Sequence, residues 1–190
     1  KAERDEQGRR RSMPNAHTKK KERKRNRKVL LINGSTNARG CTYTALSEVA
    51  STLEKEGVET EILHVGQKDI RGCIGCRKCR QTGKCVFDDI VNETAQKFEA
   101  ADGIVIGSPV YFASANSTVI SFITRLFYST QFDKSMKVGA AVVSCRRGGA
   151  SATFDEINKF FTISGMPVAS GQYWNSVHGN TAAEVRQDLG

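Results

Sequence analysis

Residues 29–42 read VLLINGSTNARGCT, a short apolar run followed by a loop rich in glycine and hydroxyl side chains. A run that stays apolar without alternation predicts a strand buried on both faces, as in a parallel sheet. Residues 42–55 follow with apolar positions at helical spacing and with Gly57 as a stop, which predicts a helix. The stretch therefore predicts the strand–loop–helix unit of α/β proteins.

The same alternation of strand and helix continues along the chain. Further strands are expected at residues 60–65, 103–107, 137–145 and 167–174, and further helices at 91–101, 117–128 and 152–164. Strands joined by helical crossovers predict a doubly wound α/β fold, with a five-stranded parallel sheet in the order 2-1-3-4-5 and helices on both faces. A last helical pattern at residues 181–189 should cover the sheet, and it is either very short or cut by the end of the sequence.

The 190 residues divide into a basic tail and a neutral body. Residues 1–28 hold 13 Lys and Arg against 4 Asp and Glu, whereas residues 29–190 hold 16 of each sign, so the net charge of +9 belongs to the tail. The tail has no hydrophobic periodicity and is expected to be disordered, either as a solvated extension or as a polyanion-binding arm. The neutral body gives no reason to expect a nucleic-acid partner.

Hydrophobic segments long enough for a membrane are absent from the sequence. No apolar run approaches the roughly 18 residues of a membrane-spanning helix. No apolar stretch follows the first charges, as it would in a secretory signal. The composition therefore argues against a membrane protein and for a cytoplasmic one.

Three predicted strands end in polar loops that contain or adjoin glycine, and in a doubly wound sheet such loops meet at the edge where ligands bind. The loop at residues 34–42 can wrap a monophosphate with backbone amides and hydroxyls at a helix N-terminus, with Arg39 offsetting the charge. It lacks the glycine patterns of nucleoside-triphosphate and dinucleotide sites. The alternative interpretation is a polar turn that caps the helix.

The other two loops suit a flat ring. Tyr111 and Phe112 stand beside Pro109, which fits a heteroaromatic ligand, although such a pair also occurs as core packing. In the loop at 144–149, Gly148 and Gly149 would let backbone amides approach a ligand closely. Its arginines would meet negative charge or be solvated.

Together, residues 34–42, 108–111, 122–126 and 147–149 resemble the flavodoxin-like NAD(P)H-dependent FMN reductases, and within them the iron–sulfur flavoprotein branch. The resemblance spans residues 28–179 and implies non-covalently bound FMN at the sheet edge, NAD(P)H as co-substrate, and a homodimer or homotetramer. By this likeness the phosphate is held by Ser35, Asn37, Arg39, Gly40, Cys41 and Thr42, the isoalloxazine is lined by Pro109, Val110, Tyr111 and Phe112, and its far side is met by Ser144, Arg146, Gly148 and Gly149. Residues 174–179 also resemble a family segment near the site, without an assigned role.

Four cysteines occupy an insertion at about residues 66–90. Cys73, Cys76, Cys79 and Cys85 have the spacing C-x2-C-x2-C-x5-C, a loop tight enough to wrap three corners of a [4Fe–4S] cubane, with a fourth ligand close behind. Structural zinc usually uses two separated cysteine pairs, so zinc fits less well, and free thiols are the other alternative. The spacing also resembles the compact cluster motif of the iron–sulfur flavoproteins, a family in which many relatives keep a cysteine-rich segment without a cluster.

The predicted function is an FMN-dependent oxidoreductase that takes electrons from NAD(P)H and passes them to a small-molecule or protein acceptor, through the cluster if one is bound. The alternatives are a cluster-free reductase of flavin, quinone, nitro or azo compounds, an electron carrier to a ferredoxin-like partner, and, last, a polyanion-binding adaptor. FMN would carry the chemistry, so no side chain is assigned a catalytic role. His17, His64 and His178 are expected to be solvated or structural.

Overall fold

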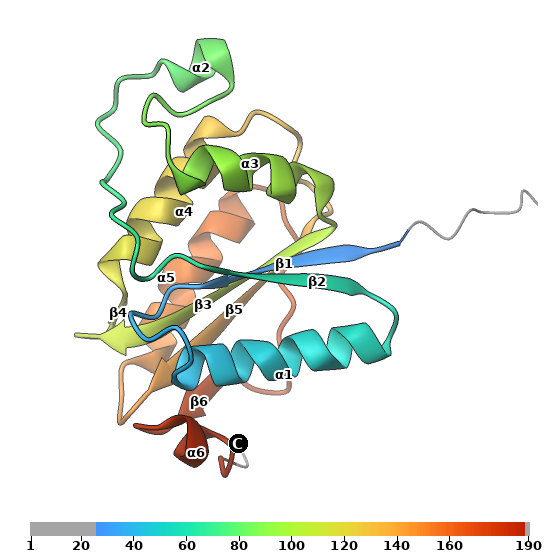
Figure 1. Ribbon diagram of the computed structural model, residues 1–190, viewed down its shortest axis with the longest axis vertical. Coiled ribbons are helices and arrows are strands. Elements are labelled where there is room, and N and C mark those ends of the chain that lie inside the picture. The colour runs from blue at the N-terminus through green and yellow to red at the C-terminus, as the bar shows by residue number, and fades with distance from the viewer. Residues whose placement is uncertain (1–25, 189–190) are drawn as a thin grey trace, which may run out of the picture.

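A mostly parallel sheet lies between two layers of helices in the computed structural model, which describes residues 26–188 (Figure 1). In chain order the elements are β1 (Lys28–Asn33), α1 (Cys41–Lys55), β2 (Glu59–His64), α2 (Cys79–Thr82), α3 (Ile90–Ala100), β3 (Gly103–Tyr111), β4 (Ser114–Ala115), α4 (Ser117–Ser129), β5 (Val138–Cys145), α5 (Ala150–Ile163), β6 (Ser176–His178) and α6 (Ala182–Val185).

Strand β1 is central, because it pairs with β2 on one side and with β3 on the other. Its apolar residues Leu30, Leu31 and Ile32 are fully buried, as the unalternating run at the start of the sequence predicted. The strand order is β2-β1-β3-β5-β6, and all of these neighbours run parallel. Counted without the antiparallel two-residue strand β4, this is the predicted order 2-1-3-4-5, so the doubly wound α/β fold is confirmed.

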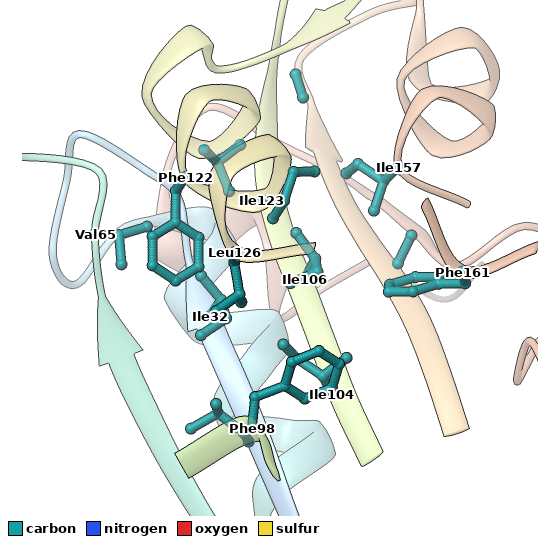
Figure 2. Packing of buried hydrophobic residues seen from close by; sticks show 14 of the residues in the cluster. Ile32, Val65, Phe98, Ile104, Ile106, Phe122, Ile123, Leu126, Ile157 and Phe161 are labelled. Atoms are coloured by element: carbon teal, nitrogen blue, oxygen red, sulfur yellow. The ribbon is translucent and has the colours of Figure 1, made fainter. Parts of the chain in front are cut away.

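Each face of the sheet has its own apolar core. Leu30 and Ile32 belong to a large cluster with side chains of α3, α4 and α5, including Phe98, Phe122 and Phe161 (Figure 2). Leu31, between them in β1, belongs to a smaller cluster formed with α1. Burying a side chain of this size contributes on the order of 1.5–3 kcal/mol, so the larger cluster supplies most of the stability.

The last strand lies later than predicted. The expected strand at residues 167–174 is wrong: Val168 forms a single bridge with Gly139, and the strand proper is β6, paired with β5. The intervening residues form a turn, because the Asn175 side chain accepts a hydrogen bond from Gly171 N at 3.1 Å and donates one to Ala169 O at 3.3 Å. These local bonds replace the ladder that a strand would need.

The helical pattern near the C-terminus gives only α6, which has four residues.

On the face of the sheet covered by α1, a groove of about 840 Å³ runs beside residues 169–177. Within residues 26–188, no helix is both long and apolar enough to cross a bilayer.

The predicted tail boundary is too late by at least one residue. Lys28 is the first residue of β1, and its Nζ lies 3.2 Å from Glu59 Oε1 and 3.3 Å from Glu61 Oε2. Residues 1–25, which include His17 and most of the proposed polyanion-binding arm, lie outside the described residues.

Candidate cofactor site

A cavity of about 430 Å³ opens where β1, β3 and β5 end, at the edge that the sequence predicted. Of the fourteen residues predicted to contact FMN, the cavity is lined by Ser35, Asn37, Arg39, Gly40, Cys41, Thr42, Pro109, Val110, Tyr111, Ser144 and Arg146. Phe112, Gly148 and Gly149 do not line it. The volume falls within the 300–1,000 Å³ typical of small-molecule and cofactor sites.

The loop after β1 is held in shape by its own side chains. The buried Asn33 accepts a hydrogen bond from Ser35 N at 3.1 Å and donates one to Ala38 O at 3.2 Å. Ser35 Oγ accepts from Asn37 N, and Asn37 Oδ1 accepts from Arg39 N, both at 3.1 Å. The backbone is therefore fixed before a ligand arrives, which reduces the entropy that binding would cost.

The end of β2 clamps this loop from outside. His64 Nε2 lies 2.8 Å from Ser35 O, which gives this histidine the structural role expected of it. Gly66 packs so closely that a Cβ there would lie 2.0 Å from Ser35 O and 2.3 Å from the carbonyl carbon. Only glycine fits at this contact, because the obstacle is backbone rather than a movable side chain.

The N-terminus of α1 faces the cavity without a cap. Gly40 occupies the N-cap position, no side chain caps the helix, and its first turn holds no acidic residue. The Thr42 hydroxyl lies 2.8 Å from Ser144 Oγ, so hydroxyls from α1 and β5 meet at the cavity. Unpaired amides at a helix N-terminus, with hydroxyls beside them, form a site for an anion such as a phosphate group.

Two cations add to this preference for negative charge. Arg39 and Arg146 both line the cavity, and neither pairs with a carboxylate anywhere in the described range 26–188. Arg39 lies over the Tyr43 ring, at 5.8 Å from its centroid. A monoanionic or dianionic group would therefore meet the helix N-terminus and two unpaired guanidinium groups.

The hairpin after β3 forms the wall on the ring side. Tyr111 is about half exposed, and its OH lies 3.2 Å from Thr36 Oγ1, so it bridges to the loop at residues 34–42. Phe112 and Ala113 both have left-handed backbones, with φ of 52° and 60°, and they form the two-residue turn between β3 and β4. This geometry turns Phe112 into solvent and away from the cavity, although the sequence placed it beside the ring.

Glu156 of α5 holds the far strand of this hairpin. Its Oε2 accepts hydrogen bonds from Ser114 Oγ at 2.9 Å and from Ala115 N at 2.8 Å. Gly149 supports the turn from the opposite side, because a Cβ there would lie 2.8 Å from Ala113 Cα. Gly149 therefore lets two protein segments approach each other, which differs from the ligand contact predicted for it.

The cavity also has residues that the sequence did not predict. They are Thr36, Cys145, Gly179, Asn180, Thr181 and Ala182. The segment at 179–182 reaches the site because β6 pairs with the end of β5 and Gly179 N donates to Cys145 O at 3.0 Å. The resemblance of residues 174–179 to a family segment was the available signal.

The two cysteines of this cavity are not activated nucleophiles. Burial is the main cause that raises the pKa of the Cys41 thiol and that of the Cys145 thiol. Both thiols are therefore protonated near neutral pH.

The four remaining cysteines line a second cavity, about 20 Å³ in volume, at the opposite end of α4. It is lined by Cys73, Cys76, Cys79 and Cys85 together with residues of the cysteine loop and of α4. Cys73 and Cys76 are exposed, Cys79 is buried, and Cys85 is partly buried. The structure therefore brings the four cysteines singled out in the sequence to one cavity.

Arg125 of α4 is fully buried beneath this cavity and uses all five of its N–H groups. Two bond the carboxylate of Asp89 at 2.7 and 2.9 Å, two bond the Arg71 and Phe87 carbonyls at 3.3 Å, and Nε donates to Cys85 Sγ at 3.2 Å. Burial lowers the pKa of the guanidinium, but the hydrogen bonds to Asp89 and Cys85 more than offset this and raise it. A permanent cation therefore lies beside a cysteine sulfur.

The donor set fits a cluster better than a single ion. Among residues 26–188, no group of three or more His, Cys, Asp or Glu converges tightly enough to hold one metal ion. A cubane presents four separate iron corners, so its four thiolates surround a space instead of meeting at a point. Ser129 also lines the cavity, and its buried Oγ has no hydrogen-bond partner among the described residues.

Comparison with known proteins points to one family. Residues 27–181 match the family described as NADPH-dependent FMN reductase. An iron–sulfur flavoprotein of Methanocaldococcus jannaschii is 35% identical over 157 residues, which are 81% of this chain and 81% of that one. An iron–sulfur flavoprotein of Methanosarcina thermophila is 28% identical over 162 residues, 83% of this chain and 85% of that one.

Solved structures with lower identity share the fold. A flavodoxin from the domain Archaea superposes with a TM-score of 0.57 at 16% identity, covering 84% of this chain and 90% of that one. An NAD(P)H:quinone oxidoreductase from Methanothermobacter marburgensis gives a TM-score of 0.59 at 12% identity, covering 84% and 92%. The flavodoxin-like architecture is therefore common to proteins with different partners.

Proposed function

The chain belongs to the NADPH-dependent FMN reductase family, and from this premise we propose that it takes electrons from NAD(P)H through FMN at the sheet edge and passes them to an acceptor through a [4Fe–4S] cluster. Membership makes the chain a flavoprotein oxidoreductase and confirms the family resemblance drawn from its loops. The co-substrate, the cluster and the acceptor are the parts that we propose.

The observation that carries the flavin site is the uncapped N-terminus of α1, which opens into the cavity that Arg39 and Arg146 also line. The amides of the first turn and the Thr42 hydroxyl would hold the FMN phosphate, and Arg39 would lie close enough to offset its charge. Tyr111 and Pro109 would line the ring. A monophosphate fits this loop better than a pyrophosphate, since the loop lacks the Gly-x-Gly-x-x-Gly pattern of dinucleotide sites.

FMN, when bound, supplies the exchange between a two-electron hydride donor and an acceptor. The protein's own contribution is position. The fixed loop after β1 holds the phosphate end, Glu156 holds the hairpin that lines the ring, and the buried Thr42–Ser144 pair closes the floor.

Cys73, Cys76, Cys79 and Cys85 would hold the cluster, which would supply one-electron transfer. The surface around them favours a protein acceptor. Five exposed cations surround the cysteines, and none forms an ion pair with a carboxylate of residues 26–188: Arg71, Arg77, Lys78, Arg80 and Lys84. Since the body as a whole is neutral, this local excess would attract a redox protein with an acidic surface.

The test is an anaerobic ultraviolet–visible spectrum of the purified, FMN-supplemented protein after desalting, with iron and acid-labile sulfide assays on the same sample. We expect flavin bands, a broad shoulder in the region of iron–sulfur absorption, and about four iron per chain. A sample without flavin would refute the cofactor. Flavin without iron would instead support a cluster-free reductase of small acceptors.

The acceptor and the subunit arrangement need separate measurements. With a cluster present, NAD(P)H oxidation should be slow until an acidic redox protein is added, and it should fall steeply with salt. We also propose a homodimer or homotetramer, for which sedimentation of the FMN-bound protein gives the mass directly.

A further inference from the structure

Among the helical Ser and Thr side chains of the described residues, Ser129 has a hydroxyl that is buried and yet unpaired. Thr94, Ser47 and Thr153 each donate to the carbonyl four residues earlier, at 2.7 to 3.1 Å, as helical Ser and Thr commonly do. Ser129 makes no such bond, although it is only 3% exposed and its Oγ is shielded from solvent. Leaving a hydroxyl buried and unpaired is unfavourable, and Ser129 lines the cysteine cavity, so a group bound there could supply the missing partner.

Arg125 lies one turn before Ser129 on α4, so the two side chains share a helix face. Both line the cysteine cavity. The guanidinium already donates Nε–H to Cys85 Sγ at 3.2 Å, and its other four N–H groups are held by Asp89 and two carbonyls. The orientation of Nε is therefore fixed by contacts that do not involve the cysteine.

We propose that Ser129 and Arg125 are positioning residues that set the reduction potential of the cluster by donating hydrogen bonds to its sulfur atoms. This inference rests on the proposed function, because it requires a [4Fe–4S] cluster on the four cysteines. With a cluster bound, the Ser129 hydroxyl would donate to one of its sulfur atoms, and Arg125 Nε would keep its hydrogen bond to the Cys85 sulfur.

The direction of the effect follows from charge. One-electron reduction adds a negative charge to the cluster and its sulfur ligands, and hydrogen-bond donors stabilise the more negative state. Both donors are buried, where an electrostatic contact is stronger than in water. Removing either donor should therefore make reduction less favourable and move the midpoint potential to more negative values.

The experiment uses the full chain loaded with FMN and cluster, and compares Ser129→Ala with Thr130→Val. Thr130 is the neighbouring residue; its hydroxyl is buried and bonds Leu126 O at 2.7 Å, and it does not line the cavity. The readout is a redox titration followed by electron paramagnetic resonance of the reduced cluster. We expect Ser129→Ala to make reduction roughly tenfold less favourable, which is about 59 mV for a one-electron couple.

Further variants separate a donor role from packing. Ser129→Thr keeps the hydroxyl and should restore the potential, and Thr130→Val should leave it unchanged. Arg125→Lys keeps the cation but loses the Nε donor, and should also lower the potential. A Ser129→Ala protein with wild-type iron content and an unchanged potential would overturn the inference and leave the proposed function intact.

Failure of the proposed function would look different. If the wild-type chain takes up no iron and sulfide, the cluster is refuted and the inference falls with it. If Ser129→Ala and Thr130→Val shift the potential equally, the effect belongs to the end of α4 in general, and the assignment to Ser129 is wrong.

Discussion

Replacing Gly66 by alanine should displace the loop at residues 34–42, although Gly66 itself does not line the cavity. Gly66 follows β2, and its N donates to Asn33 O at 3.3 Å. A Cβ at this position would lie 2.0 Å from Ser35 O and 2.7 Å from Gly34 O. Since ordinary carbon–oxygen contacts begin above about 3 Å, the two backbones must separate by roughly 1 Å. Overpacking of this kind costs about 1–3 kcal/mol of unfolding free energy.

The effect on the cofactor should exceed the effect on the fold. A shift of about 1 Å at Ser35 misaligns the amides expected to meet the phosphate, so FMN affinity should fall on the order of ten- to a hundredfold. Calorimetric titration of FMN into the apoprotein measures this, with unfolding in urea as the stability readout. Gly72→Ala is the matched control, because its Cβ would meet only Ser121 Oγ, at 4.0 Å. A folded Gly66→Ala protein that binds FMN within twofold of wild type would show that the loop at residues 34–42 is not the phosphate site.

Three further predictions concern single side chains. Thr42→Val keeps the side-chain shape but removes the hydroxyl beside Ser144, so FMN titration should show about tenfold weaker binding, and an unchanged Kd would exclude this hydroxyl from the site. The hydrogen bond from Lys97 is the main cause that lowers the pKa of Glu61 in the folded protein. The ionised Glu61 therefore adds stability at any pH above its unfolded-state pKa. This stability is lost as pH falls through the lower, folded-state pKa. Glu61→Gln should therefore cost under about 1 kcal/mol near neutral pH and nothing in acid, as urea midpoints at both pH values would show, and equal losses at both would contradict this. Phe112→Gly should raise the unfolding free energy by about 1 kcal/mol, because glycine tolerates the φ of 52° and the exposed ring has no packing to lose. Thermal unfolding tests this, and a lower Tm for the variant would show that the ring makes a stabilising contact.

The sequence predicted the fold well because its apolar periodicity is strong where the sheet is buried. Leu30, Leu31 and Ile32 are apolar in succession, a pattern typical of strands that are covered on both faces. The prediction failed at residues 167–174, where the structure has one bridge, between Val168 and Gly139, and places the strand at Ser176–His178. There the Asn175 side chain closes a turn, and no local pattern distinguishes that contact from a strand end.

The candidate site was predictable to the extent that it lies in loops that follow strands. Residues 35–42 line the cavity because the carboxyl end of β1 must lie at the sheet edge. Phe112 lies outside the cavity lining, and its direction depends on the left-handed turn that it forms with Ala113, which the sequence does not reveal. Residues 179–182 enter the cavity only through the pairing of β6 with β5, a contact between residues far apart in sequence.

Helix α4 connects the two cavities and also separates them. At the start of α4, the Asn116 side chain caps the helix by accepting a hydrogen bond from Thr118 N. The same side chain donates to Gly34 O at 2.6 Å, so it also supports the loop at residues 34–42. At its other end, Arg125 and Ser129 lie beneath the cysteines. Thirteen residues at about 1.5 Å each span roughly 20 Å, so the two sites share a rigid element but no contact. Substitutions at the two ends should therefore act independently, because coupling between side chains falls away beyond about 10 Å. If the chain holds both proposed cofactors, a substitution at the start of α4 should change FMN affinity and leave the cluster potential unchanged, and one near Ser129 should do the reverse.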